Sequence, residues 1–223
     1  MIYIIMGDEE MTKLYLTRHG ETQWNTQGRF QGWANSDLTE LGIKQAEWLE
    51  KRIRDLEIDV VYSSPTGRAY NTAEILSVKR GLEINKHDGL REINVGVWEG
   101  KSQEEIKAIC MENQHNFWNV PSKYIPTEGG ETYNEMAKRS FEAISEIIEN
   151  NKGKRILVVT HTITIKSFMC LLEKRDIDTL WHEPFVKQTS LTEIDFENGE
   201  YEILLNADIS HHEYSFKEFN QFK

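Results

Sequence analysis

Basic side chains follow three stretches of this sequence that have the composition of buried strands. The stretches are 14–17, 59–64 and 155–160, which are apolar, β-branched and aromatic in character. The basic residues that follow them are, in chain order, Arg18, His19, Arg68 and His161. Ligands bind outside the carboxyl ends of the strands in parallel, doubly covered sheets. We therefore expect two arginines and two histidines to gather at one edge of a sheet.

These residue types together suit phosphoryl transfer. A guanidinium group binds phosphate through paired hydrogen bonds and keeps its charge. One imidazole can act as a nucleophile, and a second, if protonated, can stabilise the oxygens of the transferring group. Ser63, Ser64 and the amides that open nearby helices could add neutral donors. A histidine at one strand end is more often a structural group, so the joint occurrence at three strand ends carries the inference.

Helical patterns alternate with these strands. Apolar residues recur on one face of segment 36–56, for which Thr39 is the expected N-cap, and a second helix is expected after Pro65. Capping boxes at 102–105 and 132–135 predict two more helices. Strands that alternate with helices indicate a largely parallel sheet that is covered on both faces.

The remaining segments complete the predicted fold. Segment 163–175 is expected to be helical, and 113–131 is expected to be irregular. Asn198-Gly199 is a pair that favours a type I′ turn, which predicts a hairpin. The predicted fold class is α/β: a three-layer sandwich with a mostly parallel central sheet, helices on both faces and a C-terminal antiparallel hairpin.

One domain is expected over residues 13–210. Residues 1–12 are expected to be a peripheral N-terminal extension, and 211–223 a loose C-terminal tail. Met11 offers a second start, so residues 1–10 are expected to be either a peripheral extension or a start-site artefact. The chain of 223 residues is long enough to bury a sizeable core.

Composition argues against several classes of partner. The chain has 26 basic and 37 acidic residues, a net charge of −11, which disfavours nucleic acid or an anionic membrane as a partner. No apolar run reaches about 18 residues, so no transmembrane helix is expected. Only two cysteines are present, which favours the cytoplasm. The sequence leaves the oligomeric state open, with a homodimer among the alternatives.

No metal or cofactor motif is recognisable. The sequence contains no H-x-x-x-H or C-x-x-C pattern, no phosphate-binding P-loop and no dinucleotide-binding glycine pattern. We therefore expect no metal site and no cofactor. His211 and His212 are expected in a solvated part of the tail. Three further histidines have polar neighbours in the sequence: His87, His115 and His182.

Six separated motifs occur in the order typical of one family. They are LYLTRHGETQWN, GRFQGWANSDLTELGIKQA, VVYSSPTGRAYNTAEIL, LREINVGVWEG, GGET and ILVVTH. Together they resemble the phosphoglycerate-mutase-like branch of the histidine phosphatase superfamily, over roughly residues 13–205.

The resemblance implies a role for each matching residue. His19 matches the nucleophile that becomes phosphohistidine, and His161 matches the second pocket histidine. Glu92 matches the acid that protonates the leaving oxygen and then helps to deprotonate water, whereas Glu99 is expected to be structural. Two residues match the phosphate-binding arginines, Arg18 and Arg68. Two others match positions that line the phosphate pocket, Asn25 and Gln31.

Two departures bear on the substrate. Thr162 stands where the family usually has glycine, which leaves the phosphate chemistry intact but adds a side chain to the pocket margin. The insertion typical of true mutases is absent, so the length resembles that of the phosphatases. Segment 113–131 carries Phe117, Trp118 and Tyr124, which either border the leaving-group side or form a satellite core.

The sequence therefore predicts a metal-independent phosphomonoester phosphatase that acts on small phosphorylated metabolites through phosphohistidine at His19. A cofactor-dependent phosphoglycerate mutase is the close alternative. A phospholigand-binding protein without catalysis is the alternative from another class.

Overall fold

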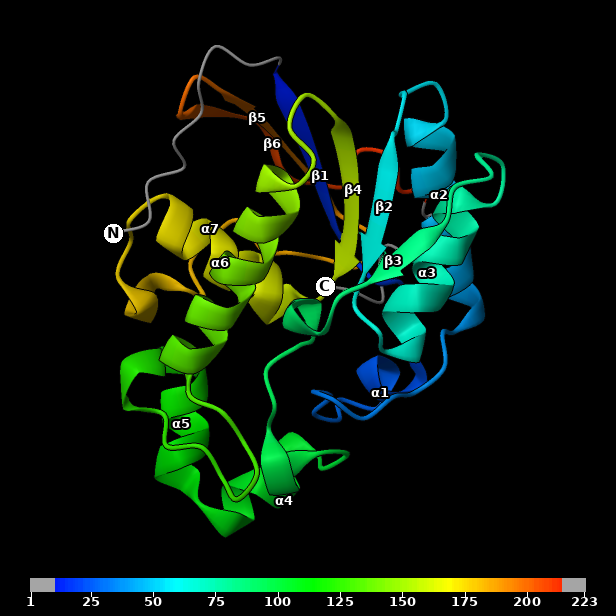
Figure 1. The fold of residues 1–223 in the computed structure, drawn as a ribbon. Helices are drawn as coiled ribbons and strands as arrows, with labels where there is room; N and C mark the ends of the chain where they lie inside the picture. Colours follow the sequence, from blue (N-terminus) through cyan, green and yellow to red (C-terminus); the bar gives the residue numbers. More distant parts are fainter. Residues whose placement is uncertain (1–10, 214–223) are drawn as a thin grey trace.

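A six-stranded sheet forms the centre of the molecule (Figure 1). The computed structural model describes residues 11–213. The strands are β1 (Thr12–Arg18), β2 (Val60–Ser63), β3 (Ile84–Lys86), β4 (Arg155–Thr160), β5 (Leu191–Glu197) and β6 (Glu200–Asp208). Their order is β3-β2-β4-β1-β5-β6. The pairs β1–β4, β2–β4 and β2–β3 are parallel, and β5 pairs antiparallel with both β1 and β6. The predicted mostly parallel sheet with a terminal hairpin is confirmed.

Helices cover both faces of this sheet (Figure 1). The α-helices are α1 (Gln23–Thr26), α2 (Glu40–Ile53), α3 (Gly67–Ser77), α4 (Gln103–Ile109), α5 (Met111–Asn119), α6 (Tyr133–Glu149) and α7 (Thr162–Leu172). Short 3₁₀ turns are η1 (Asp88–Leu90), η2 (Gly96–Trp98), η3 (Pro121–Lys123) and η4 (Ile177–Thr179). One apolar cluster joins α6 and α7 to the sheet, a second joins α2 and α3 to its other face, and a third lies beneath α4 and α5.

Local signals in the sequence set the ends of several elements. Thr39 caps α2 by accepting from the Gly42 amide at 2.9 Å. The capping boxes at Ser102 and Thr132 are both formed. At the hairpin, Gly199 has φ 78° and Asn198 has φ 52°, which fit a type I′ turn. These features were predictable because each depends on residues close together in the chain.

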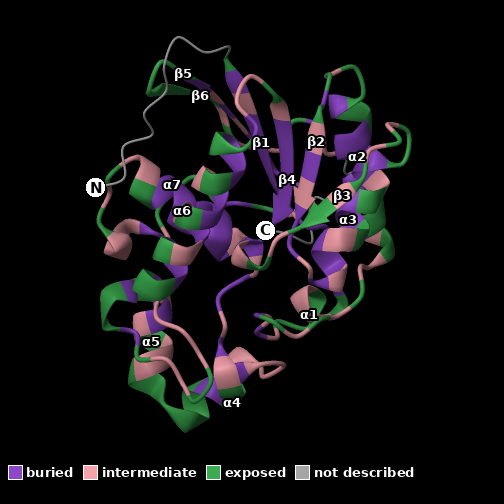
Figure 2. Cartoon of the chain, in the orientation of Figure 1, coloured by how far each residue is buried: buried purple, intermediate pink, exposed green. Residues whose placement is uncertain are grey.

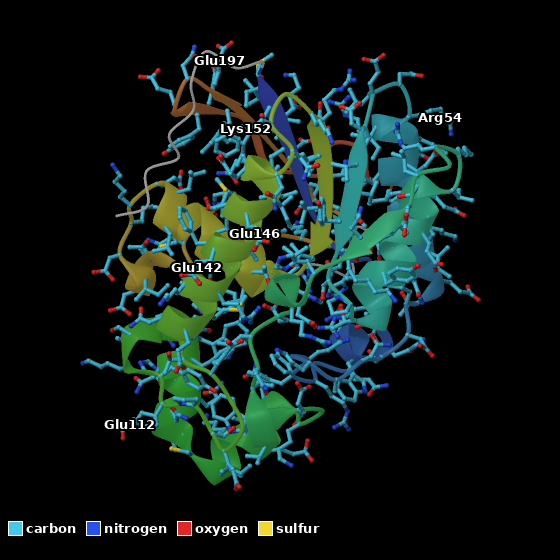
Figure 3. All side chains as sticks on the ribbon, in the orientation of Figure 1. Arg54, Glu112, Glu142, Glu146, Lys152 and Glu197 are labelled. Atoms are coloured by element: carbon cyan, nitrogen blue, oxygen red, sulfur yellow. The ribbon has the colours of Figure 1, made fainter. Side chains whose placement is uncertain are left out.

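Buried residues lie between the sheet and the helices (Figure 2), and charged side chains lie at the periphery (Figure 3). Figure 2 shows buried residues in the sheet strands and on the helix faces toward them, while the lobe made by α4 and α5 is largely exposed. Figure 3 labels charged side chains at the periphery: Arg54, Glu112, Glu142, Glu146, Lys152 and Glu197. Within residues 11–213, no helix is both long enough and apolar enough to cross a membrane.

Two sequence-based expectations need correction, and one strand has no counterpart among the predicted elements. Segment 113–131 is not wholly irregular, because α5 extends to Asn119 and buries Phe117 in an aromatic cluster. Strand β3 was not predicted. His211 is not solvated: it is buried, and its Nε2 lies 3.0 Å from the Thr189 carbonyl. The expectations for residues 1–10 and for the tail beyond residue 213 lie outside the described residues.

Candidate active site

The carboxyl ends of β1 and β4 lead into residues that line one cavity of about 330 Å³, and Ser64, which follows β2, contacts His161 beside it. Arg18, His19 and Glu92 line it, and Arg68 reaches His19 from the first turn of α3. The rings of His19 and His161 meet edge to face, with centroids 5.2 Å apart. The structure thus brings together all the residues that the sequence placed at the strand ends.

A close backbone approach fixes the segment that carries His19. Gly20 lies against the start of α2, and a Cβ atom there would stand 2.3 Å from the Gly42 carbonyl oxygen. A Cβ atom on Gly42 would stand 2.1 Å from the Glu21 carbonyl oxygen. Side chains at these two positions would push the segment after β1 away from α2, so glycine is required at both.

His19 presents an unprotonated ring nitrogen. Its Nδ1 lies 2.7 Å from the Gly20 carbonyl, which can only accept, so Nδ1 carries the proton. Nε2 then accepts from Arg68 Nε at 3.2 Å. Burial holds the pKa of His19 well below its usual value, and the charges of Arg68 and Arg18 lower it further. A neutral imidazole with a free lone pair on Nε2 is the form that can attack phosphorus.

The Arg68 guanidinium is fixed by a loop between α1 and α2. Its Nη2 donates to the Gly32 carbonyl and its Nη1 to the Ala34 carbonyl, each at 2.6 Å. The Gln31 amide fits when its oxygen faces Arg68: that oxygen then accepts from Arg68 Nη1 at 3.0 Å, and its nitrogen donates to Thr22 Oγ1. Burial lowers the pKa of Arg68 to about 10, so the group stays charged at neutral pH.

Glu99 holds this loop from the other side. Its carboxylate accepts from the amides of Gly32 at 3.2 Å, Trp33 at 2.5 Å and Ala34 at 3.2 Å. The carbonyls of Gly32 and Ala34 are the ones that orient Arg68. The geometry fits the structural role expected for Glu99. Through the loop, Glu99 positions Arg68.

Arg18 keeps donor capacity free at the cavity. Its Nη1 donates to the Val186 carbonyl at 3.2 Å, and its buried Nε has no hydrogen-bond partner among the described residues. Burial lowers the pKa of Arg18 to about 10. A buried cation with an unused donor is suited to an anionic ligand.

Glu92 is buried at the same cavity. Its Oε1 accepts from the Ile93 amide at 3.0 Å and its Oε2 from the Ile163 amide at 3.1 Å. Burial raises the pKa of Glu92, and these amides together with the charges of Arg68 and Arg18 act in the opposite direction. A raised pKa favours retention of a proton, which an acid catalyst needs.

The Glu92 backbone has two partners that the sequence did not reveal. Its carbonyl accepts from Trp33 Nε1 at 3.0 Å and from Arg139 Nη2 at 3.2 Å. Arg139 also pairs with Glu131 at 2.5 Å. The motifs GGET and LREINVG are therefore linked through Arg139, which carries no signal of its own in the sequence because it lies within the predicted helix that follows 132–135.

His161 is hydrogen-bonded to two hydroxyl groups from the segment after β2. Its Nε2 lies 2.8 Å from Ser64 Oγ and 3.3 Å from Thr66 Oγ1, and its buried Nδ1 has no partner among the described residues. Burial holds its pKa well below the usual value, so the ring is neutral in this structure. The expectation of free serine donors is corrected: Ser64 faces His161, and Ser63 donates to the Ser64 carbonyl.

Asn25 and Thr162 both line the cavity as expected. The Asn25 Oδ1 accepts from the Thr22 amide at 3.1 Å, which fixes its side chain within a capping box. Thr162 is the first residue of α7, with His161 as the N-cap. Its side chain therefore stands at the positive end of that helix.

Aromatic side chains form the far wall of the cavity. Trp118 and Trp181 pack with ring centroids 4.6 Å apart, and Trp181 Nε1 donates to the Phe117 carbonyl at 2.8 Å. Phe117 and Trp118 border the cavity, whereas Tyr124 is buried in the apolar cluster beside it. Phe117 is buried in the same cluster, so the satellite core is present, while the leaving-group alternative stays a prediction. Arg29 and Gln103 are the polar residues of this outer part.

Within residues 11–213, no group of three or more His, Cys, Asp or Glu side chains could hold a metal ion. The cationic charge beside His19 comes from Arg68 and Arg18.

Comparisons with known proteins agree in fold and in family. The sequence model described as "Histidine phosphatase superfamily (branch 1)" matches residues 14–209. The chain is 34% identical to Phosphoserine phosphatase 1 of Hydrogenobacter thermophilus over 77% of this chain and 81% of the relative. It is 36% identical to Metal-independent phosphoserine phosphatase of Arabidopsis thaliana over 69% and 66%. The solved structure of Bacillus stearothermophilus YhfR superposes with a TM-score of 0.87 at 39% identity, covering 90% of this chain and 98% of that one.

Removal of the Glu99 carboxylate should weaken anion binding through Arg68. Glu99→Ala leaves the amides of 32–34 without their acceptor, so the carbonyls that orient Arg68 lose their support. We expect the inhibition constant of vanadate to rise by about tenfold, the effect of losing about one charge-assisted hydrogen bond. Glu104→Ala, at an exposed position on α4, is the matched control. Unchanged vanadate inhibition in Glu99→Ala would contradict the positioning role.

The protonation state of His19 can be measured directly. Because its pKa lies well below the ordinary value of 6.5, the ring should remain neutral at pH 6, with the proton on Nδ1. Nitrogen-15 NMR of histidine-labelled protein should therefore show this tautomer at pH 6, assigned by its loss in His19→Gln. The signal of exposed His115, which His19→Gln should leave unchanged, serves as the reference. A doubly protonated His19 at pH 6 would refute the assignment.

Proposed function

The chain belongs to the histidine phosphatase superfamily, and we propose that it is a metal-independent phosphomonoester phosphatase that works through phosphohistidine at His19. The observation that carries the proposal is the unprotonated Nε2 of His19, which stands beside Arg68 on the cavity that Arg18 and Glu92 also line. Nucleophile, phosphate-binding cations and acid are thus present together, as the reaction requires. The names of the two phosphatase relatives support the same activity, one of them without metal.

The first half-reaction forms a bond between His19 Nε2 and phosphorus. As that bond forms, the ester P–O bond breaks, and its electron pair moves to the alcohol oxygen. Protonated Glu92 gives its proton to that oxygen, and the alcohol leaves. Arg18 and Arg68 pair with the non-bridging oxygens and offset their charge, a task that metal ions perform in other phosphatases.

The second half-reaction returns the site to its starting state. Glu92, now a carboxylate, takes a proton from water while the water oxygen attacks phosphorus. The P–N bond breaks, its electron pair returns to His19 Nε2, and inorganic phosphate is released. A dianion on His19 favours the charged form of neighbouring His161, so phosphorylation should raise the pKa of that ring.

The substrate class follows from the size and lining of the cavity. A volume of about 330 Å³ suits a small molecule, and the aromatic wall lies beyond the phosphate-binding residues. We propose small phosphorylated metabolites as substrates. A single catalytic domain over residues 13–210 is part of the proposal. A cytoplasmic location and a homodimer stay predictions from the sequence.

Labelling tests the nucleophile. Brief reaction with a phosphate-radiolabelled substrate, with a chelator present, should give a protein label that is acid-labile and base-stable, as expected for phosphohistidine. His19→Ala should lose the label, while His115→Ala, at an exposed position, should keep it. Label that persists in His19→Ala would refute the nucleophile. Rapid transfer of the label to a second sugar acid, in preference to water, would favour the mutase alternative.

Leaving-group dependence tests Glu92. Glu92→Gln keeps the shape of the side chain but removes the proton, and a positioned acid contributes about 10² to 10⁴ in rate. Single-turnover phosphorylation by alkyl phosphates should slow by a factor of this size, because an alkoxide leaves only when protonated. Nitrophenyl phosphate needs little assistance and should react at nearly the normal rate. Equal slowing with both substrates would exclude Glu92 as the acid.

A further inference from the structure

Segment 181–186 contributes to both halves of the candidate active site. Trp181, at its start, lines the aromatic wall of the cavity. Val186, at its end, supplies the carbonyl that accepts from Arg18 Nη1 at 3.2 Å. Residues 182–185 between them are exposed and belong to no helix or strand. Trp181 and Val186 are themselves packed in apolar clusters, so the exposed residues 182–185 are the weakly packed part of a segment that places a phosphate-binding arginine and a cavity wall.

Lys166 holds the middle of this segment. It lies on α7, five residues after His161, and is only 5% exposed. Its Nζ donates to the His182 carbonyl at 2.8 Å and to the Pro184 carbonyl at 2.9 Å. Both partners are backbone carbonyls, so the ammonium group fixes the path of the chain rather than the rotamer of one side chain.

The sequence of α7 makes this lysine unusual. The helix reads TITIKSFMCLL, and Lys166 is the charged residue within an otherwise apolar and hydroxyl-bearing run. Burial of an ammonium group is unfavourable unless hydrogen bonds compensate, and here the two carbonyls do so. Burial, with a smaller contribution from Arg175, lowers the pKa of Lys166 to about 8, while Cys170 and Glu173 act in the opposite direction. The group therefore remains largely charged at neutral pH, and its hydrogen bonds are charge-assisted.

We propose that Lys166 is a positioning residue for phosphate binding: it fixes segment 181–186 so that the Val186 carbonyl orients Arg18 and Trp181 closes the aromatic wall. The inference rests on the proposed function, since it takes Arg18 to bind the phosphate group. It assigns to a residue outside the cavity an effect on substrate affinity that is transmitted through the backbone.

The first test replaces the lysine by a residue of similar length without donors. In Lys166→Met, the inhibition constant of vanadate and the KM of nitrophenyl phosphate should rise by about tenfold, as expected when a binding group loses one charge-assisted interaction. The kcat should change much less, because His19 and Glu92 are not held by this segment. Lys187→Met, at an exposed position beside Val186, is the matched control and should leave all three values unchanged. Lys166→Gln, which can donate to one carbonyl, should give intermediate values if Lys166→Met does not fold.

A double-mutant cycle shows whether the effect passes through Arg18. Arg18→Lys alone should weaken vanadate inhibition, and adding Lys166→Met should then have little further effect, because the group that it positions is already altered. Full additivity of the two effects would overturn the proposal. So would a lower midpoint of thermal unfolding in Lys166→Met with normal vanadate inhibition, since that is a purely structural role. Failure of Arg18→Lys itself to weaken vanadate inhibition would instead contradict the proposed function.

Discussion

Two guanidinium groups held beside a neutral imidazole are the constraint on which this site depends. Arg68 is buried and Arg18 is half-buried, and their hydrogen-bond partners at the site are backbone carbonyls, the His19 ring and the Gln31 amide rather than paired carboxylates. A cation that is shielded from water and only partly compensated by the protein binds an anion strongly, because the anion provides the missing negative charge and hydrogen-bond acceptors. The carbonyls must therefore be rigid enough to orient each cation without neutralising it.

Three polar side chains outside the cavity provide that rigidity. Glu99 holds the amides of 32–34, Arg139 holds the carbonyl of Glu92, and Lys166 holds the carbonyls of 182 and 184. Each acts on the backbone, and each backbone segment in turn places one functional group. The same burial that keeps the arginines available lowers the pKa of His19 and raises that of Glu92. One physical cause thus acts on both the proposed nucleophile and the proposed acid.

The sequence predicted what depends on neighbouring residues and on topology. Thr39, the two capping boxes and the type I′ turn are local, and the meeting of Arg18, Arg68 and His161 follows from the carboxyl edge of a parallel sheet. The backbone supports could not be predicted, because they join distant residues: Glu99 and Gly32 are 67 positions apart. The burial of His211 was missed for the same reason, since its partner Thr189 is 22 positions away.

The apolar clusters separate the residues proposed to bind phosphate from the aromatic wall proposed to face the leaving group. His19, Arg18 and Arg68 stand at the ends of β1 and the start of α3, which are anchored in the two clusters that flank the sheet. The aromatic wall belongs to the third cluster, beneath α4 and α5, which form a lobe beyond the carboxyl ends of the strands (Figure 1). Substitutions in that lobe can reshape the leaving-group side without disturbing the sheet edge, because they act on a different core. Segment 181–186 is a point where the two parts meet, since Trp181 belongs to the wall and Val186 contacts Arg18. Coupling between substrate choice and phosphate affinity must therefore pass in part through this short segment, which Lys166 holds in place.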